Sequence, residues 1–503
     1  MTQRPRRATD LVCAALLLLA ALAARLPGIN GDLWLDEAWV ANSILTPTWR
    51  EMFFYEPWLQ TTPPLHLAVT RLLVAVLGDA NWVFRSLSLI FGLGSVFLAV
   101  RLGRRIFSPL MGWLAGALIA LSSSAAMFSK EGKSYSGELC AALMLMLLVV
   151  ELPAWWIATA AMLFAFGFSY SSVVFFPGVV LAYLLAGKLR VPQAAGVLAG
   201  LGIPAALTYW FYIRPNQGED LNEMWRFAFP QDDVLGFYWR TTRSIFAVHH
   251  WPPLLAVSLL RQFVLILALG GILKAVWQIW RERDPRLALT ALLPFACTIL
   301  LNAFGRYPYD AERFSLYLFG SVALLVVAGV DGVLPKPIPA MASIAIALTL
   351  AAACAGALGH WPRRVDVGLT EARQELRRQG AGAGDILFVA PQQWEGYRMA
   401  QRRDKLPVEA MEGLAAPACC PRDGRWQAAT YATDVEPEMD QLIARGTGRR
   451  IWLLHQKLPL VNVESQGIPE IWHRAYLVRK GCREEFAREY QSTVLSAYRC
   501  PLL

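Results

Sequence analysis

Repeated apolar runs limit the fold of this sequence more than any other feature. Stretches long enough to cross a bilayer recur between positions 11 and 358, and roughly 20 apolar residues in a helix suffice to cross one. The 503-residue chain is 56% hydrophobic and only 17% charged, with a mean hydropathy of +0.39. A soluble protein of this length carries more charge. We therefore predict a polytopic α-helical membrane protein, a class that the 19 Trp residues also fit because indoles favour the membrane interface.

The basic residues set the predicted orientation. The net charge of +9 does not argue for nucleic-acid binding, because the basic clusters fall on one side of the predicted spans. Arg4, Arg6 and Arg7 precede the first apolar run, 11–26, which keeps the N-terminus cytoplasmic under the positive-inside rule. A cleaved signal peptide with a weak site at 21–23 is the alternative to this uncleaved first helix.

The short apolar helix expected at 65–77 decides the side of every later loop. If it crosses the membrane, Arg101, Arg104 and Arg105 lie outside; if it only dips in, they lie inside, as the positive-inside rule prefers. We choose the topology in which the helix at 65–77 only dips into the membrane, and we expect a second interfacial helix at 43–58. About eleven spans then alternate in direction, and the acidic loops lie outside. The spans after the first are 83–102, 110–128, 139–150, 154–168, 171–185, 195–213, 254–279, 287–304, 314–330 and 338–358.

Beyond His360 the composition becomes that of a soluble domain in which strand and helix patterns alternate, typical of a small α/β fold. We predict a transmembrane catalytic domain at 1–358, with its first outer loop at 28–81, and an extracytoplasmic α/β domain at 359–503 that shapes the acceptor entrance. No glycine-rich phosphate loop follows the first strand, so no nucleotide site is expected there. The expected elements are helices at 366–379 and 435–444, strands at 385–390 and 450–455, and a strand pair within 485–498.

The eight cysteines form two groups. Those in apolar runs are expected to be small buried residues: Cys13, Cys140, Cys297 and Cys354. Those in the polar tail allow up to two disulfides if the tail is extracytoplasmic, with the pairing open: Cys419, Cys420, Cys482 and Cys500. Their spacing does not fit a zinc site.

Two adjacent carboxylates, Asp36 and Glu37, stand among apolar and aromatic residues just after the first span. Carboxylates at a membrane face are costly unless they are paired or used. They are either a helix cap or solvated acid pair, or part of a catalytic site. The predicted topology places them outside with the other dense polar loops, which hold Lys130, Glu131, Lys133, Tyr135, Arg306, Tyr307, Tyr309, Asp310, Glu312 and Arg313.

These residue types suit transfer of a group from a lipid-phosphate donor. A carboxylate can take a proton from an acceptor hydroxyl or amine, and arginine and lysine stabilise a departing phosphate. Simpler interpretations are an interfacial ion pair of Asp310 with Arg313 and a solvated turn at 130–133. The pair His249-His250 is a weak candidate for zinc, since adjacent side chains diverge, and His66 is expected to be structural.

Four stretches and one later motif resemble a known family, the GT-C superfamily glycosyltransferases of the group containing protein O-mannosyltransferases and the lipid A aminoarabinose transferase. The first-loop Asp-Glu motif of that family resembles 35–38, and its Pro-Pro-Leu segment resembles 62–65. Its arginine-led helix resembles 85–107, and its second outer loop resembles 129–135. Tyr307-Pro308-Tyr309 with Arg313 resembles a later motif, and the likeness covers about 30–330.

The resemblance implies roles for individual residues. Asp36 would be the catalytic base, with Glu37 and Glu131 as supporting acids, and Arg313 would bind the donor phosphate. Two positions depart from the family pattern: Thr62 stands where a Lys is frequent, and Lys133 stands where the second loop has an Arg. Lysine is a point charge without the bidentate fork of arginine. The segment 169–171 also stands where many relatives have a His.

The predicted function is that of an inverting glycosyltransferase in the bacterial inner membrane. It moves a sugar from a dolichyl- or polyprenyl-phosphate donor to an extracytoplasmic lipid, glycan or protein. No cofactor is required by the pattern, and Asp36 with Glu131 could hold a divalent metal. The alternative is a lipid or glycolipid transporter, or a non-catalytic envelope-assembly scaffold; nearly charge-free central spans favour surface chemistry. The predicted substrate-binding residues are Lys130, Lys133, Tyr135, Arg306, Tyr307, Tyr309 and Arg313.

Overall fold

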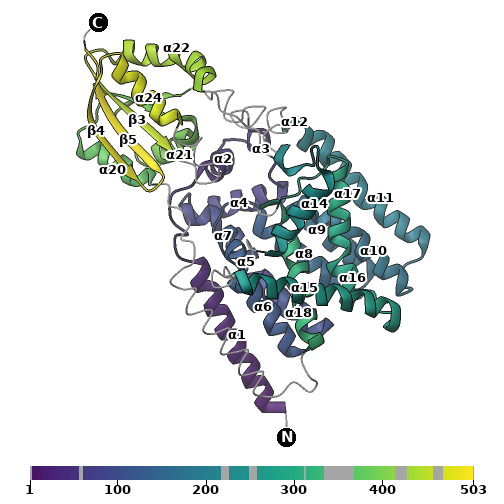
Figure 1. Ribbon diagram of the computed structural model, residues 1–503. Helices are drawn as coiled ribbons and strands as arrows, with labels where there is room; N and C mark the ends of the chain where they lie inside the picture. Colours follow the sequence, from purple (N-terminus) through teal and green to yellow (C-terminus); the bar gives the residue numbers. More distant parts are fainter. Residues whose placement is uncertain are drawn as a thin grey trace. The chain divides into compact units, whose positions relative to one another are not determined.

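The chain forms two compact units (Figure 1). The computed structural model describes residues 3–55, 61–216, 226–247, 258–310, 313–333, 368–413, 428–456 and 468–501. The membrane unit comprises Met1–Ile29 and Phe53–Arg363, and the α/β unit comprises Asn30–Met52 and Arg364–Leu503. The segment that carries Asp36 and Glu37 therefore belongs with the C-terminal residues. The boundary expected at 358/359 lies outside the described residues.

The membrane unit is helical, as predicted. Five helical segments in the described part are long and apolar enough to cross a membrane: Asn81–Ile106, Val191–Asn216, Val264–Glu282, Arg286–Ala303 and Arg313–Val333. Shorter apolar helices are Pro64–Leu77, Pro109–Leu121, Trp155–Phe168 and Tyr170–Leu185. The chain is thus a multi-pass membrane protein. The expected total of about eleven spans stays a prediction, and the span expected at 338–358 lies outside the described residues.

The described elements of the membrane unit are α1 (Gln3–Arg25), α4 (Pro64–Leu77), α5 (Asn81–Ile106), α6 (Pro109–Leu121), α7 (Ser123–Phe128), α8 (Tyr135–Glu151), α9 (Trp155–Phe168), η1 (Tyr170–Phe175), α10 (Phe176–Leu185), α11 (Val191–Thr208), η2 (Tyr209–Ile213), α12 (Arg214–Asn216), η3 (Arg226–Ala228), α14 (Val234–Ala247), α15 (Ser258–Trp277), η5 (Gln278–Glu282), α16 (Arg286–Ala291), α17 (Leu293–Ala303), η6 (Arg313–Leu318) and α18 (Phe319–Val333). Two more helices, α2 (Leu35–Ile44) and α3 (Trp49–Phe53), lie in the first loop.

Two expectations about continuous helices are wrong. The run at 110–128 is divided into α6 and α7 because Ser122 caps α7, its Oγ accepting from the backbone nitrogen of Ala125 at 3.1 Å. The interfacial helix expected at 43–58 does not form as one element. Helix α2 instead ends at Ile44 and α3 begins at Trp49.

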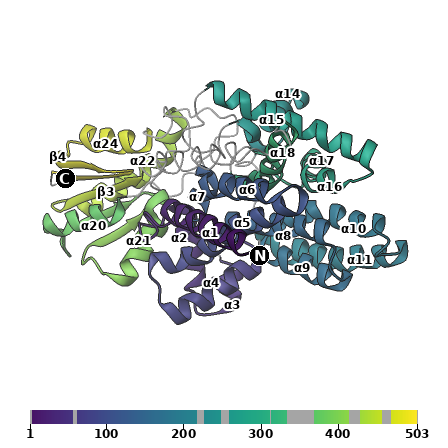
Figure 2. The same ribbon diagram turned by 90° about the horizontal axis from the view of Figure 1, so that it is seen from below.

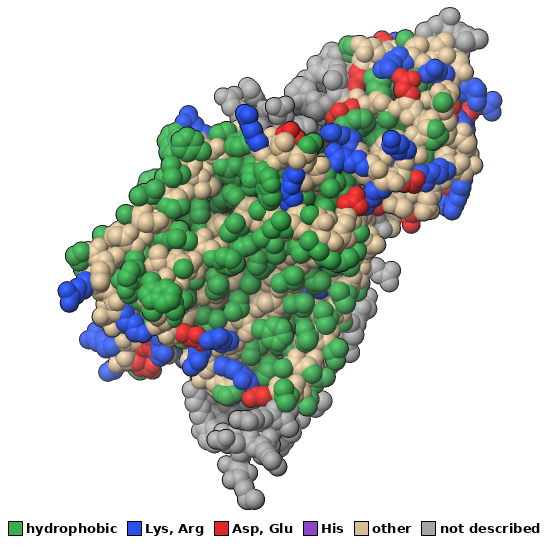
Figure 3. All heavy atoms as spheres, turned by 180° about the vertical axis from the view of Figure 1, so that it is seen from behind, with side chains coloured by type: hydrophobic (Ala, Val, Ile, Leu, Met, Phe, Trp, Pro, Cys, Tyr) green, Lys and Arg blue, Asp and Glu red, His purple; other side chains and the backbone are tan. Residues whose placement is uncertain are grey.

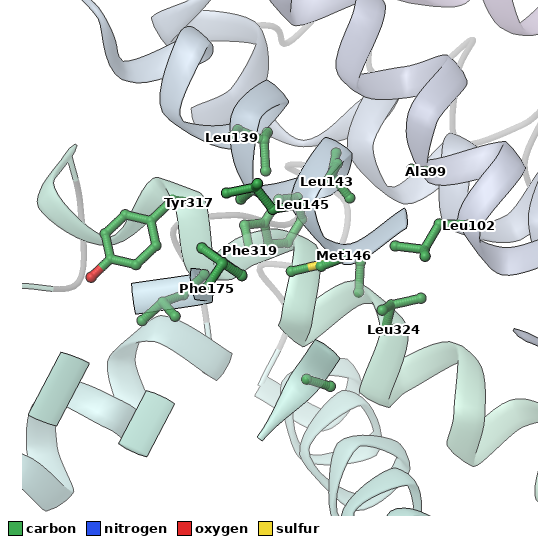
Figure 4. Packing of buried hydrophobic residues seen from close by; sticks show 14 of the residues in the cluster. Ala99, Leu102, Leu139, Leu143, Leu145, Met146, Phe175, Tyr317, Phe319 and Leu324 are labelled. Carbon is green, nitrogen blue, oxygen red and sulfur yellow. The ribbon is translucent and has the colours of Figure 1, made fainter. Parts of the chain in front are cut away.

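The core of the membrane unit lies where α5, α8, η1, η6 and α18 meet. Figure 4 shows apolar side chains from these elements interlocking, with Met146 and Leu143 of α8 near Phe319 and Leu324 of α18. All four are buried. This packing fixes the N-terminal end of α8, which follows the second predicted outer loop.

The α/β unit is a three-layer sandwich. Its five strands have the order β2-β1-β3-β5-β4, with β2, β1 and β3 parallel and β5 antiparallel to both β3 and β4. Figure 2 shows α22 and α24 on one side of the sheet and α20 and α21 on the other. Alternate residues of β1 face the two layers: Ile386 and Phe388 pack in one core, Leu387 and Val389 in the other. The elements are α20 (Leu369–Arg378), β1 (Ile386–Val389), α21 (Pro391–Arg403), β2 (Glu409–Glu412), α22 (Ala428–Gly446), β3 (Arg450–Gln456), α24 (Ile468–Arg479), β4 (Arg483–Tyr490) and β5 (Thr493–Arg499).

The prediction of a small C-terminal α/β domain is confirmed, with the expected helices and strands near their places. One disulfide joins Cys482 to Cys500. Cys13, Cys140 and Cys297 are free, and the three remaining cysteines lie outside the described residues. The two units also differ in surface: the visible face of the membrane unit is mainly apolar, while that of the α/β unit is rich in charged side chains (Figure 3).

Candidate functional site

The predicted acid pair lies in the first turn of α2. Glu37 is 1% exposed, and its Oε2 accepts from the backbone nitrogen of Trp34 at 3.3 Å. This contact satisfies a donor at the helix N-terminus, so Glu37 serves as a cap. Asp36, one position earlier, is only partly buried. The two neighbouring carboxylates therefore have different surroundings, and Asp36 is the more accessible.

The loop between α7 and α8 holds the second group of predicted site residues. Lys130 is 0% exposed and Glu131 is 4% exposed, so a solvated turn does not describe them. Lys133 and Tyr135 are half-buried. Two buried charges of opposite sign in one short loop must be compensated locally, since an uncompensated buried charge is strongly destabilising.

Serine hydroxyls fix this loop against α5 and α8. Ser88 Oγ donates to the backbone oxygen of Lys133 at 2.8 Å, and Ser136 Oγ lies 3.2 Å from Ser129 Oγ. Gly92 of α5 allows the close approach, because a Cβ there would stand 2.0 Å from Ser129 Oγ. The loop is held at both ends as well as at its centre.

Arg25 is a buried residue that the sequence pattern did not single out. It is 0% exposed at the end of α1. Its Nη1 donates to Ala120 O at 2.8 Å, its Nη2 to Ile119 O at 3.1 Å, and its Nε to Ser129 Oγ at 3.2 Å. The guanidinium thus binds the last carbonyl groups of α6 and the second loop together. The sequence signal that could have identified Arg25 is its position as a charged residue at the end of the first apolar run.

The predicted charged outer loop at 305–313, here the third loop, contains two tyrosines that differ in accessibility. Tyr309 is 0% exposed; its hydroxyl is 2.8 Å from Thr242 Oγ1 and its nitrogen donates to Ala228 O at 2.9 Å. Burial raises the pKa of Tyr309 to about 12. Tyr309 therefore anchors α14 and η3 to the loop. Tyr307 keeps part of its surface exposed.

The cations of this loop differ as well. Arg306 is exposed, with Nη1 3.4 Å from the Tyr209 hydroxyl. Arg313 is half-buried at the start of η6, with its guanidinium 5.0 Å from the Phe314 ring. Asp310 is half-buried. Glu312, like His249-His250, lies outside the described residues.

Glu138 links the second loop to η1. This carboxyl group lies one turn into α8 and is 8% exposed, with Ser134 Oγ at 3.4 Å and Ser171 Oγ at 3.3 Å. Burial raises the pKa of Tyr307 well above its usual value, and the nearby carboxyl group of Glu138 adds to this rise. The sequence prediction missed Glu138, although an acid heading an apolar helix was a visible signal.

Thr62, which stands where the family pattern has a lysine, is held in place through its backbone carbonyl group. Thr62 is 6% exposed, and its carbonyl oxygen accepts from the Tyr212 hydroxyl at 2.8 Å. His66, in the first turn of the following helix α4, is 0% exposed, and within the described residues neither ring nitrogen has a hydrogen-bond partner of good geometry. The expectation that His66 is structural stays a prediction.

The predicted site residues divide between the units. Asp36 and Glu37 belong to the α/β unit, whereas the remaining described ones belong to the membrane unit. Within the membrane unit, Tyr307 lies near Glu138, a residue that the sequence prediction did not include. Across the described residues, no group of three or more His, Cys, Asp or Glu side chains is arranged to hold a metal ion.

Comparison with solved structures identifies proteins that have a similar fold. No family model and no curated protein matches the sequence. The structure is similar to that of ArnT from Cupriavidus metallidurans bound to undecaprenyl phosphate, with a TM-score of 0.51, 16% identity, and coverage of 97% of this chain and 98% of ArnT. The apo structure of the same ArnT gives a TM-score of 0.52 at 15% identity, with 98% of both chains covered. At this identity the likeness concerns the fold alone. The chain therefore has the fold of this ArnT, in agreement with the resemblance that the motifs of its membrane part indicated.

Proposed function

We propose that this protein is a GT-C-type glycosyltransferase that moves a sugar from a polyprenyl-phosphate donor to an extracytoplasmic acceptor. The observation that carries the proposal is the similarity, over nearly the whole of both chains, to an ArnT structure with undecaprenyl phosphate bound. The motif order 35–38, 62–65, 129–135 and 307–313 adds support that is independent of overall shape. Sugar and acceptor are open.

The second loop offers the cationic part of such a site. Lys130 and Glu131 are buried and fixed, and Lys133 beside them is partly exposed. Charges held away from water act more strongly on a phosphate than solvated ones. Lys133, with Arg306 and Arg313 of the third loop, would hold the phosphate of the donor. A preorganised cationic site costs no reorganisation when negative charge develops during the reaction.

The reaction would be a single displacement. Asp36 takes the proton from the acceptor hydroxyl or amine as the acceptor atom attacks the anomeric carbon. The bond between that carbon and the phosphate oxygen breaks, and its electron pair leaves with the polyprenyl phosphate. The cations stabilise this departing anion. One displacement inverts the anomeric centre. Glu37, which caps α2, would act by orienting the turn that carries Asp36.

The proposed topology puts the site on the outer face of the bacterial inner membrane, with the N-terminus cytoplasmic and the α/β unit outside. The Cys482–Cys500 disulfide supports this placement, because disulfides persist in oxidising compartments and are rare in the cytosol. Three arginines at the start of α1, Arg4, Arg6 and Arg7, support it through the positive-inside rule. Labelling of an introduced cysteine in the α/β unit by a membrane-impermeant reagent would check it.

The test is transfer from labelled polyprenyl-phosphate sugars by membranes that contain the protein. Asp36→Asn should lower turnover by roughly 10²-fold or more, the range in which a general base contributes. Glu51→Gln is the matched control, since Glu51 is an exposed acid of the same first loop and should leave turnover unchanged. Full turnover by well-folded Asp36→Asn would remove Asp36 from the mechanism. Absence of transfer by the wild type with a panel of lipid-linked sugars would refute the proposed function.

A further inference from the structure

We propose that the α/β unit positions the catalytic base, and that Asn42 and Glu395 are the positioning residues through which it does so. This inference rests on the proposed function. It assigns the C-terminal domain a task other than the predicted shaping of the acceptor entrance. Helix α2, which carries Asp36, is built into that domain, because Asn30–Met52 and Arg364–Leu503 form one compact unit.

A buried polar contact joins α2 to α21. Asn42 Nδ2 donates to Glu395 Oε2 at 2.6 Å and to Glu395 O at 2.9 Å. Both residues are 0% exposed. The two positions are 353 residues apart in sequence. A buried amide bound to both a carboxylate and a carbonyl of one residue defines the placement of the helix more narrowly than apolar packing does, because hydrogen bonds depend on angle as well as distance.

Glu395 is itself held in place. Its Oε1 accepts from Arg398 Nη1 at 3.0 Å, within α21. The carboxylate therefore binds a cation of its own helix on one oxygen and the amide of α2 on the other. Charge-assisted hydrogen bonds of this kind are stronger than neutral ones. The pair of contacts makes Glu395 a rigid acceptor for α2 rather than a mobile side chain.

A second contact fixes the chain just before α2. Asp32 Oδ2 accepts from the backbone nitrogen of Thr370 at 2.8 Å, and its Oδ1 accepts from Thr370 Oγ1 at 2.5 Å. Thr370 lies in the first turn of α20. A carboxylate is favourable there, since it satisfies a free amide and meets the positive end of the helix dipole. Asp36 thus lies between two points, Asp32 and Asn42, that are both tied to the C-terminal domain.

Positioning of a base has a direct effect on rate. A general base must reach the acceptor proton within hydrogen-bond distance, and a misplacement of about 1 Å costs roughly 10²-fold in rate. Asp36 is on a helix anchored on both sides, so its placement follows the α/β unit. A loop-borne carboxylate would be free to adjust independently.

The contact offers an exchange experiment. Asn42→Asp places a carboxylate against Glu395 and should displace α2 by repulsion. Asn42→Asp combined with Glu395→Gln restores an amide-carboxylate pair with the two groups exchanged, and should recover the placement. Glu409→Gln is the control: it breaks the exposed ion pairs of Glu409 with Arg445 and Arg449 in the same unit.

Two measurements on the full-length protein separate positioning from folding. Hydrogen exchange across 35–44 should quicken in Asn42→Asp and return toward the wild-type rate in the double variant, with the sheet unaffected. Turnover with a polyprenyl-phosphate sugar should fall roughly 10²-fold in kcat with an unchanged KM for the donor. The double variant should regain at least about a tenth of the wild-type kcat, and Glu409→Gln should retain wild-type kcat.

Wild-type kcat in Asn42→Asp would overturn the inference and leave the proposed function intact. So would a double variant that regains the exchange pattern of α2 but no activity, because placement of α2 would then not limit the reaction. A fall in activity with an altered sheet in Asn42→Asp would assign the contact to stability alone and also overturn it. Absence of transfer by the wild type would instead refute the proposed function, and the inference with it.

Discussion

Arg25 Nε donates to Ser129 Oγ at 3.2 Å, joining residues 104 positions apart in sequence. The same guanidinium binds the carbonyl groups of Ile119 and Ala120. A single side chain of the first helix thus holds the end of α6 and the loop with the buried charges Lys130 and Glu131. The position of this loop depends on α1 even though α1 carries none of the predicted site residues.

Replacement of Arg25 should therefore destabilise the membrane unit. Arg25→Met keeps much of the volume but leaves two buried carbonyl groups without this donor, and each unsatisfied group costs about 1–3 kcal/mol. We expect a loss of about 2–5 kcal/mol in a detergent unfolding assay. Arg105→Gln is the control, because Arg105 is exposed and its ion-pair partner among the described residues is Glu151; it should change stability by less than about 1 kcal/mol. Equal effects of the two substitutions would contradict the structural role of Arg25.

Glycines at the crossing of α15 and α18 give a second prediction. A Cβ on Gly271 would stand 1.9 Å from Leu325 O, and one on Gly329 would stand 2.0 Å from Leu267 O. Small residues at such crossings let helix backbones approach closely within a membrane. Gly271→Ala should force the helices apart and cost about 1–3 kcal/mol, the usual range for overpacking.

Gly332→Ala on α18, the helix that crosses α15, is the matched control, because a Cβ there meets no atom of the described residues within 4 Å. It should be neutral or slightly stabilising, by up to about 1 kcal/mol, since alanine restricts the unfolded chain. Thermal unfolding in detergent, followed by loss of helical circular dichroism, distinguishes the two substitutions. A Gly271→Ala variant as stable as Gly332→Ala would mean that the helices cross at a greater distance.

The carboxyl group of Glu138 should act through its hydrogen bonds to Ser134 of the second loop and Ser171 of η1. Glu138→Gln keeps an acceptor for Ser171, while Glu138→Ala leaves the hydroxyl groups of Ser171 and Ser134 without it. We expect Glu138→Ala to cost about 1–3 kcal/mol and Glu138→Gln to cost less than half of that. A double-mutant cycle with Ser171→Ala should give a coupling energy of about 0.5–3 kcal/mol. Coupling near zero would show that Glu138 and Ser171 act independently.

The sequence predicted those parts of the fold that depend on local pattern. The continuous apolar run at 83–102 became α5, and the apolar runs of strand length at 385–390 and 450–455 became β1 and β3. The break at Ser122 was not predicted, because the three serines at 122–124 stand within an apolar run and the capping role of Ser122 depends on its own rotamer. Local pattern determines an element more reliably than it determines where the element ends.

Long-range pairing accounts for most of what the sequence did not predict. The edge strand β2, Glu409–Glu412, is charged at both ends and gains its structure from the register with β1. The hydrogen bond of Asn42 to Glu395 joins residues 353 positions apart, and no local sequence pattern predicts it. The types of candidate site residues were predictable from chemistry. The burial of Lys130 and the anchoring role of Tyr309 were not, because they depend on which elements pack over them.

Two buried histidines give the α/β unit a stability that depends on pH. His455 Nε2 and His473 Nδ1 are 2.7 Å apart, and both rings pack near Phe388. Burial lowers the pKa of His473 to about 3, and burial with the neighbouring His473 lowers the pKa of His455 well below its usual value of 6.5. Both are neutral in the folded protein at pH 7.

The unfolded chain binds more protons than the folded one between the two pKa values of each histidine, so stability rises with pH in that window. The stabilisation is complete above about pH 6.5 and is lost as the pH falls toward the folded pKa, with a slope of at most about 1.4 kcal/mol per pH unit for each histidine. Urea unfolding of the α/β unit in the intact protein from pH 7 to pH 4 should show this decline. His473→Gln cannot titrate and should flatten the slope relative to the wild type, whereas Glu409→Gln should reproduce the wild-type slope. An identical slope in His473→Gln would show that His473 does not contribute to the acid sensitivity.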